Sequence, residues 1–131
     1  MSIKMSGPYN SGTPVGANGS ALVSTDYTVT INGEVRGIYV RYNGANPPAT
    51  ADLTIKTLGS GIPSYNLLVI TDGNTNGLFL VRKGVVDAAA AALTFDGTRL
   101  QTAPIPVFDG ITIALAQGNA ANTVDVWLLY E

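Results

Sequence analysis

Alternation of apolar and polar residues runs along most of this chain, and it is clearest in the C-terminal residues 110–131. Residues 111–117 and 123–130 each carry apolar side chains at every second position. Strand side chains point alternately to opposite faces, so each run would present one apolar face. The polar, glycine-containing residues 118–122 between them predict a hairpin turn. Because a two-stranded ribbon cannot bury such a face alone, other segments must cover it.

Further runs with the same two-residue period predict additional strands. The dipeptide Asn32-Gly33 indicates a tight hairpin, because both residues accept positive φ angles. Residues 66–71 are apolar on both faces, which is typical of a central strand of a sandwich. The alanine-rich residues 85–93 are the one helix candidate, but they are too few to hold a helix without packing, so we expect a loop. The other strand-like runs are residues 21–31, 34–42, 52–58, 78–82 and 103–108.

These runs predict an all-β fold, an antiparallel β-sandwich of jelly-roll type with about eight strands, formed by residues 20–131. Short strands at regular spacing, with no convincing strand–helix–strand unit, are typical of sandwiches and barrels. The core is predicted from the inward positions of each run. These are Val29, Ile38, Val40, Leu53, Ile55, Leu67, Val69, Leu80, Ile113, Leu115, Val126 and Leu128.

The N-terminal residues 1–19 differ from the rest of the chain in composition. They are rich in glycine, serine, proline and asparagine and show no period of 2 or 3.6. One interpretation is a disordered leader. The other is an extended arm that becomes ordered on a neighbouring subunit. In that case, deleting residues 1–19 would leave the sandwich folded. The contacts with other subunits would then come from Ile3, Met5, Tyr9 and Val15.

Composition and charge narrow the function classes. Charged residues make up only 12% of the chain and hydrophobic ones 46%, which argues for a folded domain. The seven basic residues are scattered and the net charge is −2, so there is no basic stripe for nucleic acid. No apolar run approaches the roughly 20 residues of a membrane span. Cysteine and histidine are absent, which excludes disulfides, thiolate nucleophiles, histidine triads and common zinc sites.

One loop partly matches a calcium-binding pattern. Residues 72–77 (DGNTNG) fit the first half of the EF-hand loop. The complete pattern needs a bidentate glutamate at position twelve, which is Lys83 in this chain. Asparagine and glycine are also what a β connection requires for local hydrogen bonds and positive φ angles. We therefore expect a structural connection without metal, and no cofactor.

Candidate catalytic and sugar-stacking residues are also weighed against simpler roles. The nine acidic residues are dispersed, whereas a glycosidase needs two carboxyl groups facing each other about 5 to 10 Å apart. We therefore expect no enzymatic activity. Four aromatic residues could stack on a sugar, but aromatics at alternating strand positions usually belong to the core. They are Tyr39, Tyr42, Phe79 and Trp127.

Three groups of motifs, taken in order, resemble small virion proteins of tailed bacteriophages, of the head decoration (cement) type. The resemblance spans residues 35–131, with no single diagnostic motif, and leaves residues 1–19 outside. The motifs are residues 37–42 (GIYVRY) with 51–55 (ADLTI), residues 82–87 (RKGVVD) with 91–98 (AALTFDGT), and residues 111–119 (ITIALAQGN) with 124–131 (VDVWLLYE).

This resemblance implies a structural role rather than a reaction. It implies a protein made in the host cytoplasm that binds the major capsid protein on the outer surface of the virion and stiffens the shell. It also implies self-association as a homotrimer, with no nucleic acid or membrane as partner. The alternative is a carbohydrate-binding or adhesin module of a phage tail fibre, which would expose aromatic side chains in a groove. A small hydrolase would instead show clustered carboxylates.

Overall fold

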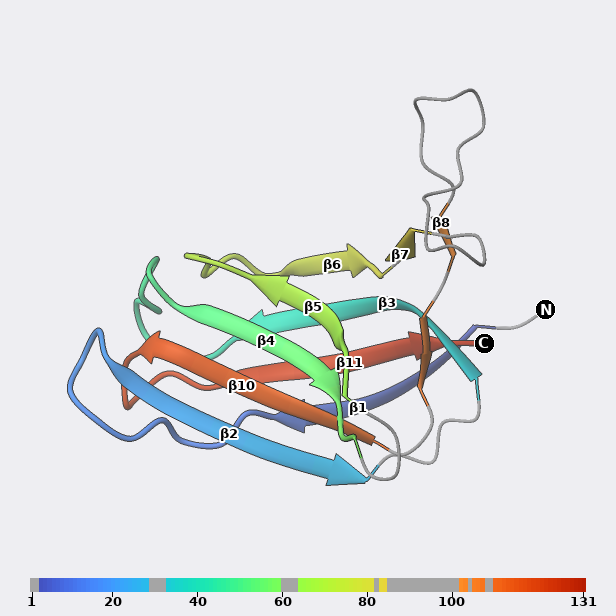
Figure 1. The fold of residues 1–131 in the computed structure, drawn as a ribbon. Coiled ribbons are helices and arrows are strands. Elements are labelled where there is room, and N and C mark those ends of the chain that lie inside the picture. The colour runs from blue at the N-terminus through green and yellow to red at the C-terminus, as the bar shows by residue number, and fades with distance from the viewer. Residues whose placement is uncertain are drawn as a thin grey trace.

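A computed structural model describes residues 3–28, 33–59, 64–81, 83–84, 102–103, 105–107 and 110–131. The described residues form eleven β-strands and no helix, so the part of the chain that is described has no helix that could cross a membrane. The strands build two facing antiparallel sheets (Figure 1). The all-β prediction is confirmed.

Five strands form the first sheet, with four in the order β1-β11-β3-β6 and β9 pairing with β3 beside them. Their bounds are β1 Lys4–Asn10, β3 Gly33–Tyr42, β6 Gly77–Leu80, β9 Ile105–Val107 and β11 Val124–Tyr130. The two ends of the described chain lie close together in this sheet (Figure 1), because Lys4 pairs with Tyr130.

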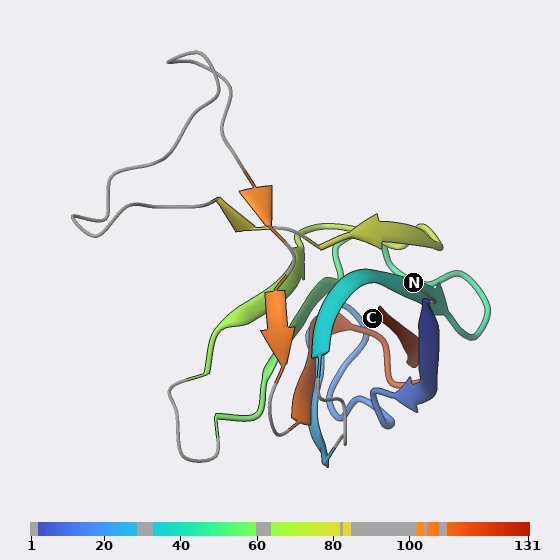
Figure 2. The same cartoon turned by 90° about the vertical axis from the view of Figure 1, so that its right-hand side faces the viewer.

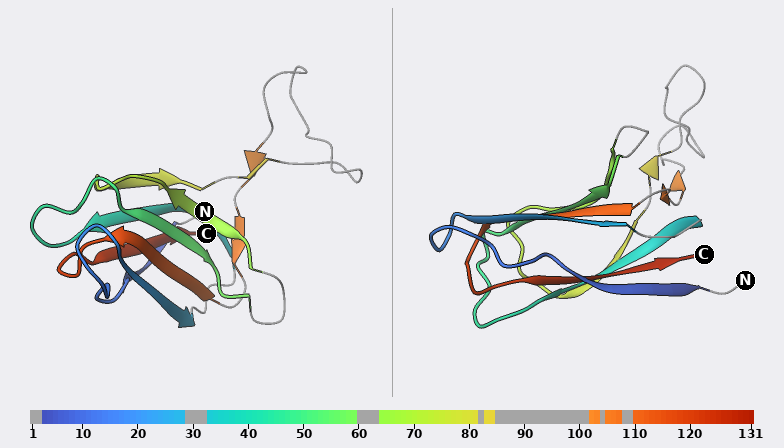
Figure 3. Two further views of the ribbon diagram at one scale, coloured as in Figure 1. Left: turned by 60° about the vertical axis from the view of Figure 1, so that its left-hand side comes forward. Right: turned by 90° about the horizontal axis from the view of Figure 1, so that it is seen from below.

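Four strands form the second sheet, in the order β2-β10-β4-β5. Their bounds are β2 Ala21–Thr28, β4 Asp52–Thr57, β5 Asn66–Ile70 and β10 Gly110–Gly118. The right-hand view in Figure 3 shows β2 and β10 in one layer and β1, β3 and β11 in the other. A separate short ribbon pairs β7 (Lys83–Gly84) with β8 (Thr102–Ala103) and lies apart from both sheets (Figure 2).

The strand order identifies the predicted jelly roll. Without the short strands β7, β8 and β9, eight strands remain. In the first sheet the first strand lies beside the eighth, the eighth beside the third and the third beside the sixth. In the second sheet the second strand lies beside the seventh, the seventh beside the fourth and the fourth beside the fifth. This order is that of two Greek keys wound together, which is the jelly-roll arrangement.

The core lies between the two sheets and confirms most of the predicted inward positions. Strand β4 shows the expected period most clearly, with Leu53, Ile55 and Thr57 buried and the residues between them partly exposed. Of the predicted core residues, those found buried are Ile38, Val40, Leu53, Ile55, Leu67, Ile113, Leu115, Val126 and Leu128. Val29 lies outside the described residues.

The core prediction is wrong for two residues, Val69 and Leu80, because their side chains point outward. Val69 is 53% exposed: the register shifts in β5, so that Leu67 and Leu68 both pack inward and Val69 turns to solvent. Leu80 is 76% exposed, because the inward positions near it are Phe79 and the buried Val81. Strand β5 is also an edge strand rather than a central one. Apolar residues on both faces leave the phase of a strand undetermined by sequence.

The N-terminal segment is extended, as predicted, but it belongs to the sandwich of its own chain. Strand β1 pairs along β11. The next residue, Ser11, is fully buried, and its backbone N–H donates to the carbonyl of Val124 at 2.8 Å. Tyr9 packs against the core and against Tyr27, with 5.2 Å between ring centroids. The described residues 3–19 are therefore not a disordered leader, and β1 belongs to the same sandwich as the rest of the chain.

Candidate interaction surface on the first sheet

The outer face of the first sheet takes its character from the pairing of its two central strands. In β11, Val126 and Leu128 point into the core, so the alternate residues Trp127 and Leu129 point outward. Opposite residues in antiparallel strands share a face. Trp127 pairs with Tyr39 and Leu129 with Gly37. The result is two neighbouring rows of outward positions across the sheet.

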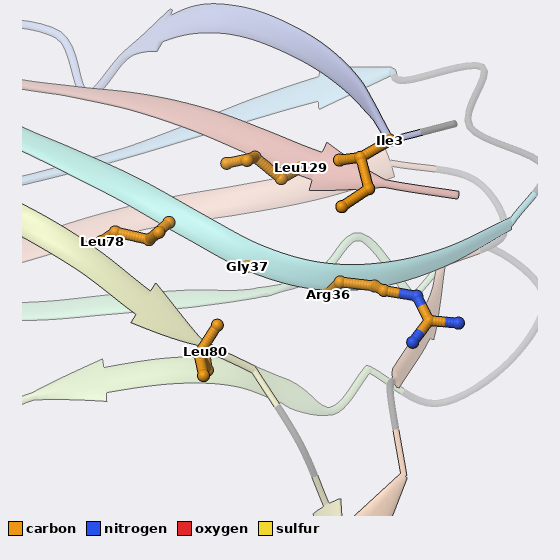
Figure 4. A pocket seen from close by; sticks show the side chains of 6 residues that line it. All are labelled: Ile3, Arg36, Gly37, Leu78, Leu80 and Leu129. Carbon is orange, nitrogen blue, oxygen red and sulfur yellow. The ribbon is translucent and has the colours of Figure 1, made fainter. Parts of the chain in front are cut away.

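The first row crosses four strands, with Met5, Leu129, Gly37 and Leu80 in register. Because Gly37 has no side chain, the row has a depression at β3. Figure 4 shows Ile3 and Leu129 on one side of β3 and Leu78 and Leu80 on the other. The depression is lined by these four side chains together with Gly37 and Arg36.

The second row is aromatic. Tyr39 and Trp127 meet edge to face, with 5.5 Å between ring centroids and 65° between ring planes. The Arg41 guanidinium lies 5.0 Å from the Trp127 ring centroid, which is cation–π distance. Leu78, 55% exposed, pairs with Tyr39 from β6. The prediction that Tyr39 and Trp127 belong to the core is therefore wrong: Tyr39 is 39% exposed and both rings lie on the outer face.

The other two aromatic residues behave as core residues. Tyr42 is buried, and burial raises the pKa of its hydroxyl. Phe79 is packed against the core from β6. The core interpretation is thus confirmed for these two rings.

We call the exposed apolar surface made by these two rows the apolar face. All but one of its members occupy outward positions in strands of the first sheet, and the exception, Ile3, directly precedes β1. They are Ile3, Met5, Gly37, Tyr39, Leu78, Leu80, Trp127 and Leu129.

A polar network closes one end of the apolar face. The Asp125 carboxylate accepts hydrogen bonds from Arg41 Nη2 at 2.6 Å, Asn10 Nδ2 at 2.8 Å and Asn43 Nδ2 at 2.9 Å. Burial alone would raise the pKa of Asp125, but these hydrogen bonds and the charge of Arg41 outweigh it and lower the pKa below its usual value. These hydrogen bonds tie β1 and β3 to β11. A carboxylate that stays ionised and already accepts three hydrogen bonds is poorly suited to act as a base.

An ion pair closes the opposite end. Arg36 Nε lies 2.5 Å from Glu131 Oε2, and Arg36 Nη2 lies 3.7 Å from Glu34 Oε2. Each arginine bordering the apolar face is therefore neutralised by an acid of the same chain. Neither of these two arginines is therefore a free positive charge for nucleic acid or another polyanion.

The partial calcium motif is tied down by its own side chains and backbone. Asp72 N donates to Asp52 Oδ1 at 2.9 Å, and Asn74 Nδ2 donates to the Pro47 carbonyl at 2.8 Å. The Asn76 side-chain oxygen accepts from the Tyr42 backbone at 2.7 Å. These bonds support a structural connection. Among the described residues, no three acidic, histidine or cysteine side chains gather as a metal site would require.

The four predicted contact residues fall in different places. Ile3 and Met5 lie on the apolar face and are 62% and 67% exposed. Val15, 77% exposed, bridges to Leu22 at the edge of the second sheet. Tyr9 packs against the core, which leaves it poorly placed for a partner.

Sequence reasoning missed the larger part of the apolar face. Leu78, Leu80 and Leu129 read as ordinary strand residues, and the only signal was the excess of apolar residues over what one inward face needs. In comparisons with protein-family models, characterised proteins and solved structures, nothing matched this chain significantly.

Proposed function

We propose that this protein is a structural component of a bacteriophage virion that binds the outer surface of the capsid and stabilises it. The observation that carries the proposal is the apolar face, which suits packing against protein rather than chemistry on a small molecule. The motifs of residues 35–131 and the jelly-roll order, an architecture found in viral capsid and lectin domains, support it. The proposed assembly is a homotrimer on the major capsid protein, made in the host cytoplasm and carried on the capsid surface.

The physical basis of such stabilisation is linkage. A protein that binds the assembled shell, but not the separate capsid subunits, shifts the equilibrium toward the shell by mass action. The sandwich suits this role because its packed core and the polar contacts at the ends of its first sheet hold it rigid. A rigid protein loses little conformational entropy on binding. No catalytic residue and no cofactor enter the proposal.

The test is to mix purified protein with heads assembled without it. Co-sedimentation should saturate at a fixed ratio to the major capsid protein, and decorated heads should release their contents at higher temperature than bare heads. Protein that stays in the supernatant at every concentration would reject the proposal.

A second candidate is favoured by one specific observation. The Tyr39–Trp127 pair lies on an outer face, as a carbohydrate-binding or adhesin module of a tail fibre would require. Trp127 is the single tryptophan of the chain, so its fluorescence reports on this face alone. Saturable quenching by host-surface polysaccharide, removed in Tyr39→Ala, would favour this function, whereas unchanged emission would reject it.

A further inference from the structure

The two outer sheet faces differ in chemistry. Most outward side chains of the second sheet are polar on β2 and β4, for example Ser24, Asp26, Thr54 and Lys56. Its exposed large apolar side chains, Leu22 and Val69, stand on the two opposite edge strands and form no continuous row. The first sheet presents aliphatic and aromatic side chains instead. Since both faces would meet the same solvent in a free monomer, the difference indicates that the first face is covered in use.

The size of the apolar face matches a stable protein contact. Its five most exposed large side chains are between 39% and 76% exposed. With roughly 200 Å² for each large side chain, they leave on the order of 600 Å² of apolar surface. That value reaches the upper end for the largest patch of a typical monomer, and it is close to the roughly 800 Å² that each partner buries in a standard interface.

The face also carries a protrusion and a depression side by side. Leu80, 76% exposed, pairs directly with Gly37, where the depression lies. Neighbouring strands are about 4.8 Å apart, so the protruding side chain and the hole are separated by about that distance. Both arginines at its ends are neutralised within the chain, so two such faces meet without charge repulsion.

From this shape and charge we infer that the occupant of the apolar face is a second copy of this chain, with Leu80 of one copy seated over Gly37 of the next. A reciprocal arrangement closes a two-fold pair, and a head-to-tail arrangement closes a ring. The ring is the form that the proposed trimer would take. The contact itself does not depend on the virion role, because it is argued from the face alone.

The test compares two exposed aliphatic residues on edge strands of the two sheets. Leu80→Ser should raise the dissociation constant for self-association by about tenfold or more, measured by sedimentation velocity over a dilution series. The control Val69→Ser, at a 53% exposed position on the second sheet, should leave it unchanged. Circular dichroism should show both variants folded, because both positions are exposed.

A second variant fills the depression. In Gly37→Ala the added Cβ would lie 3.3 Å from Leu78 Cδ1 and 3.4 Å from the Phe79 carbonyl, a fit that needs only a small shift of a leucine end. It should also weaken self-association. A monomer at every concentration, or an oligomer that neither variant weakens, would overturn the inference, and saccharide quenching of Trp127 in a monomer would assign the face to a glycan. A two-fold mass would reject the trimer while keeping this contact.

Discussion

At the residue scale, Asp125 shows how a charged side chain can be almost fully buried on a sheet face. It is 8% exposed, and its oxygens accept from Asn10 of β1, Arg41 of β3 and Asn43, the residue after β3. Removing its charge while keeping its shape would place an amide among three donors. The cost therefore combines a lost ion pair with an unsatisfied donor.

For this reason we predict that Asp125→Asn lowers the free energy of unfolding at neutral pH by about 1 to 3 kcal/mol. The pKa of Asp125 is lowered in the folded state, so its contribution is present above the unfolded-state pKa and is lost as the pH falls through the folded-state pKa. The free energy of unfolding of the wild type should therefore lose this contribution below about pH 4, whereas that of the variant has no such contribution to lose. The control is Asp72→Asn at an exposed position with φ of 52°, which asparagine tolerates.

A second residue-scale prediction concerns the core. Leu115 is 3% exposed, and it pairs with Leu53 on the neighbouring strand β4 of the same sheet. Its replacement by alanine should cost about 2 to 5 kcal/mol in chemical denaturation. Val69→Ala, at an exposed site, should cost less than about half a kcal/mol. Equal losses at the two sites would mean that the inward face of β10 is misassigned.

At the scale of elements, the sequence identified strands where their alternation was clean. Strands β3, β4, β10 and β11 carry apolar residues at alternate positions, and every core residue predicted in them is buried. It failed for β5 and β6, because both carry apolar residues on both faces and a register shift in β5 changes the phase. It also missed β1, because Gly7 and Pro8 interrupt any alternation where the register shifts. Four members of the apolar face lie in or beside β1 and β6, the strands of the first sheet that the sequence left ambiguous, so the face as a whole could not be predicted from sequence.

The pairing of β1 reverses the expectation for an N-terminal truncation. The Val124 N–H donates to Ser11 Oγ at 2.9 Å, and Thr25 Oγ1 donates to the Ser11 carbonyl at 2.6 Å. Ser11→Ala would leave the Val124 N–H buried without its acceptor, so we predict a loss of about 1 to 3 kcal/mol on unfolding. Deleting residues 1–11 should destabilise the protein far more, because the deletion removes β1 and its pairing with β11. A truncated protein with wild-type melting temperature would show that β1 is dispensable.

At the scale of the whole molecule, the exposed large apolar residues of the N-terminal segment lie at two separate places, one on the first sheet and one beside the second. Ile3 and Met5 bring β1 to the apolar face, whereas Val15 lies exposed beside the second sheet. If copies associate through the apolar face, surfaces such as the one around Val15 stay open toward a shell. Several copies joined in this way bind a repeating surface with avidity, because the later contacts form within one assembly.

The last prediction links self-association to capsid binding. Leu80→Ser, which should be monomeric, should bind heads with an apparent affinity at least about tenfold weaker than the wild type, because avidity is lost while each shell contact is intact. Val69→Ser should bind as the wild type does, and Val15→Asp should weaken head binding without changing the oligomer mass. These quantities come from co-sedimentation with heads and from sedimentation velocity of the free protein. If monomeric Leu80→Ser decorated heads as well as the wild type, self-association would be irrelevant to decoration. If Val15→Asp also bound normally, the shell contact would lie elsewhere on the sandwich.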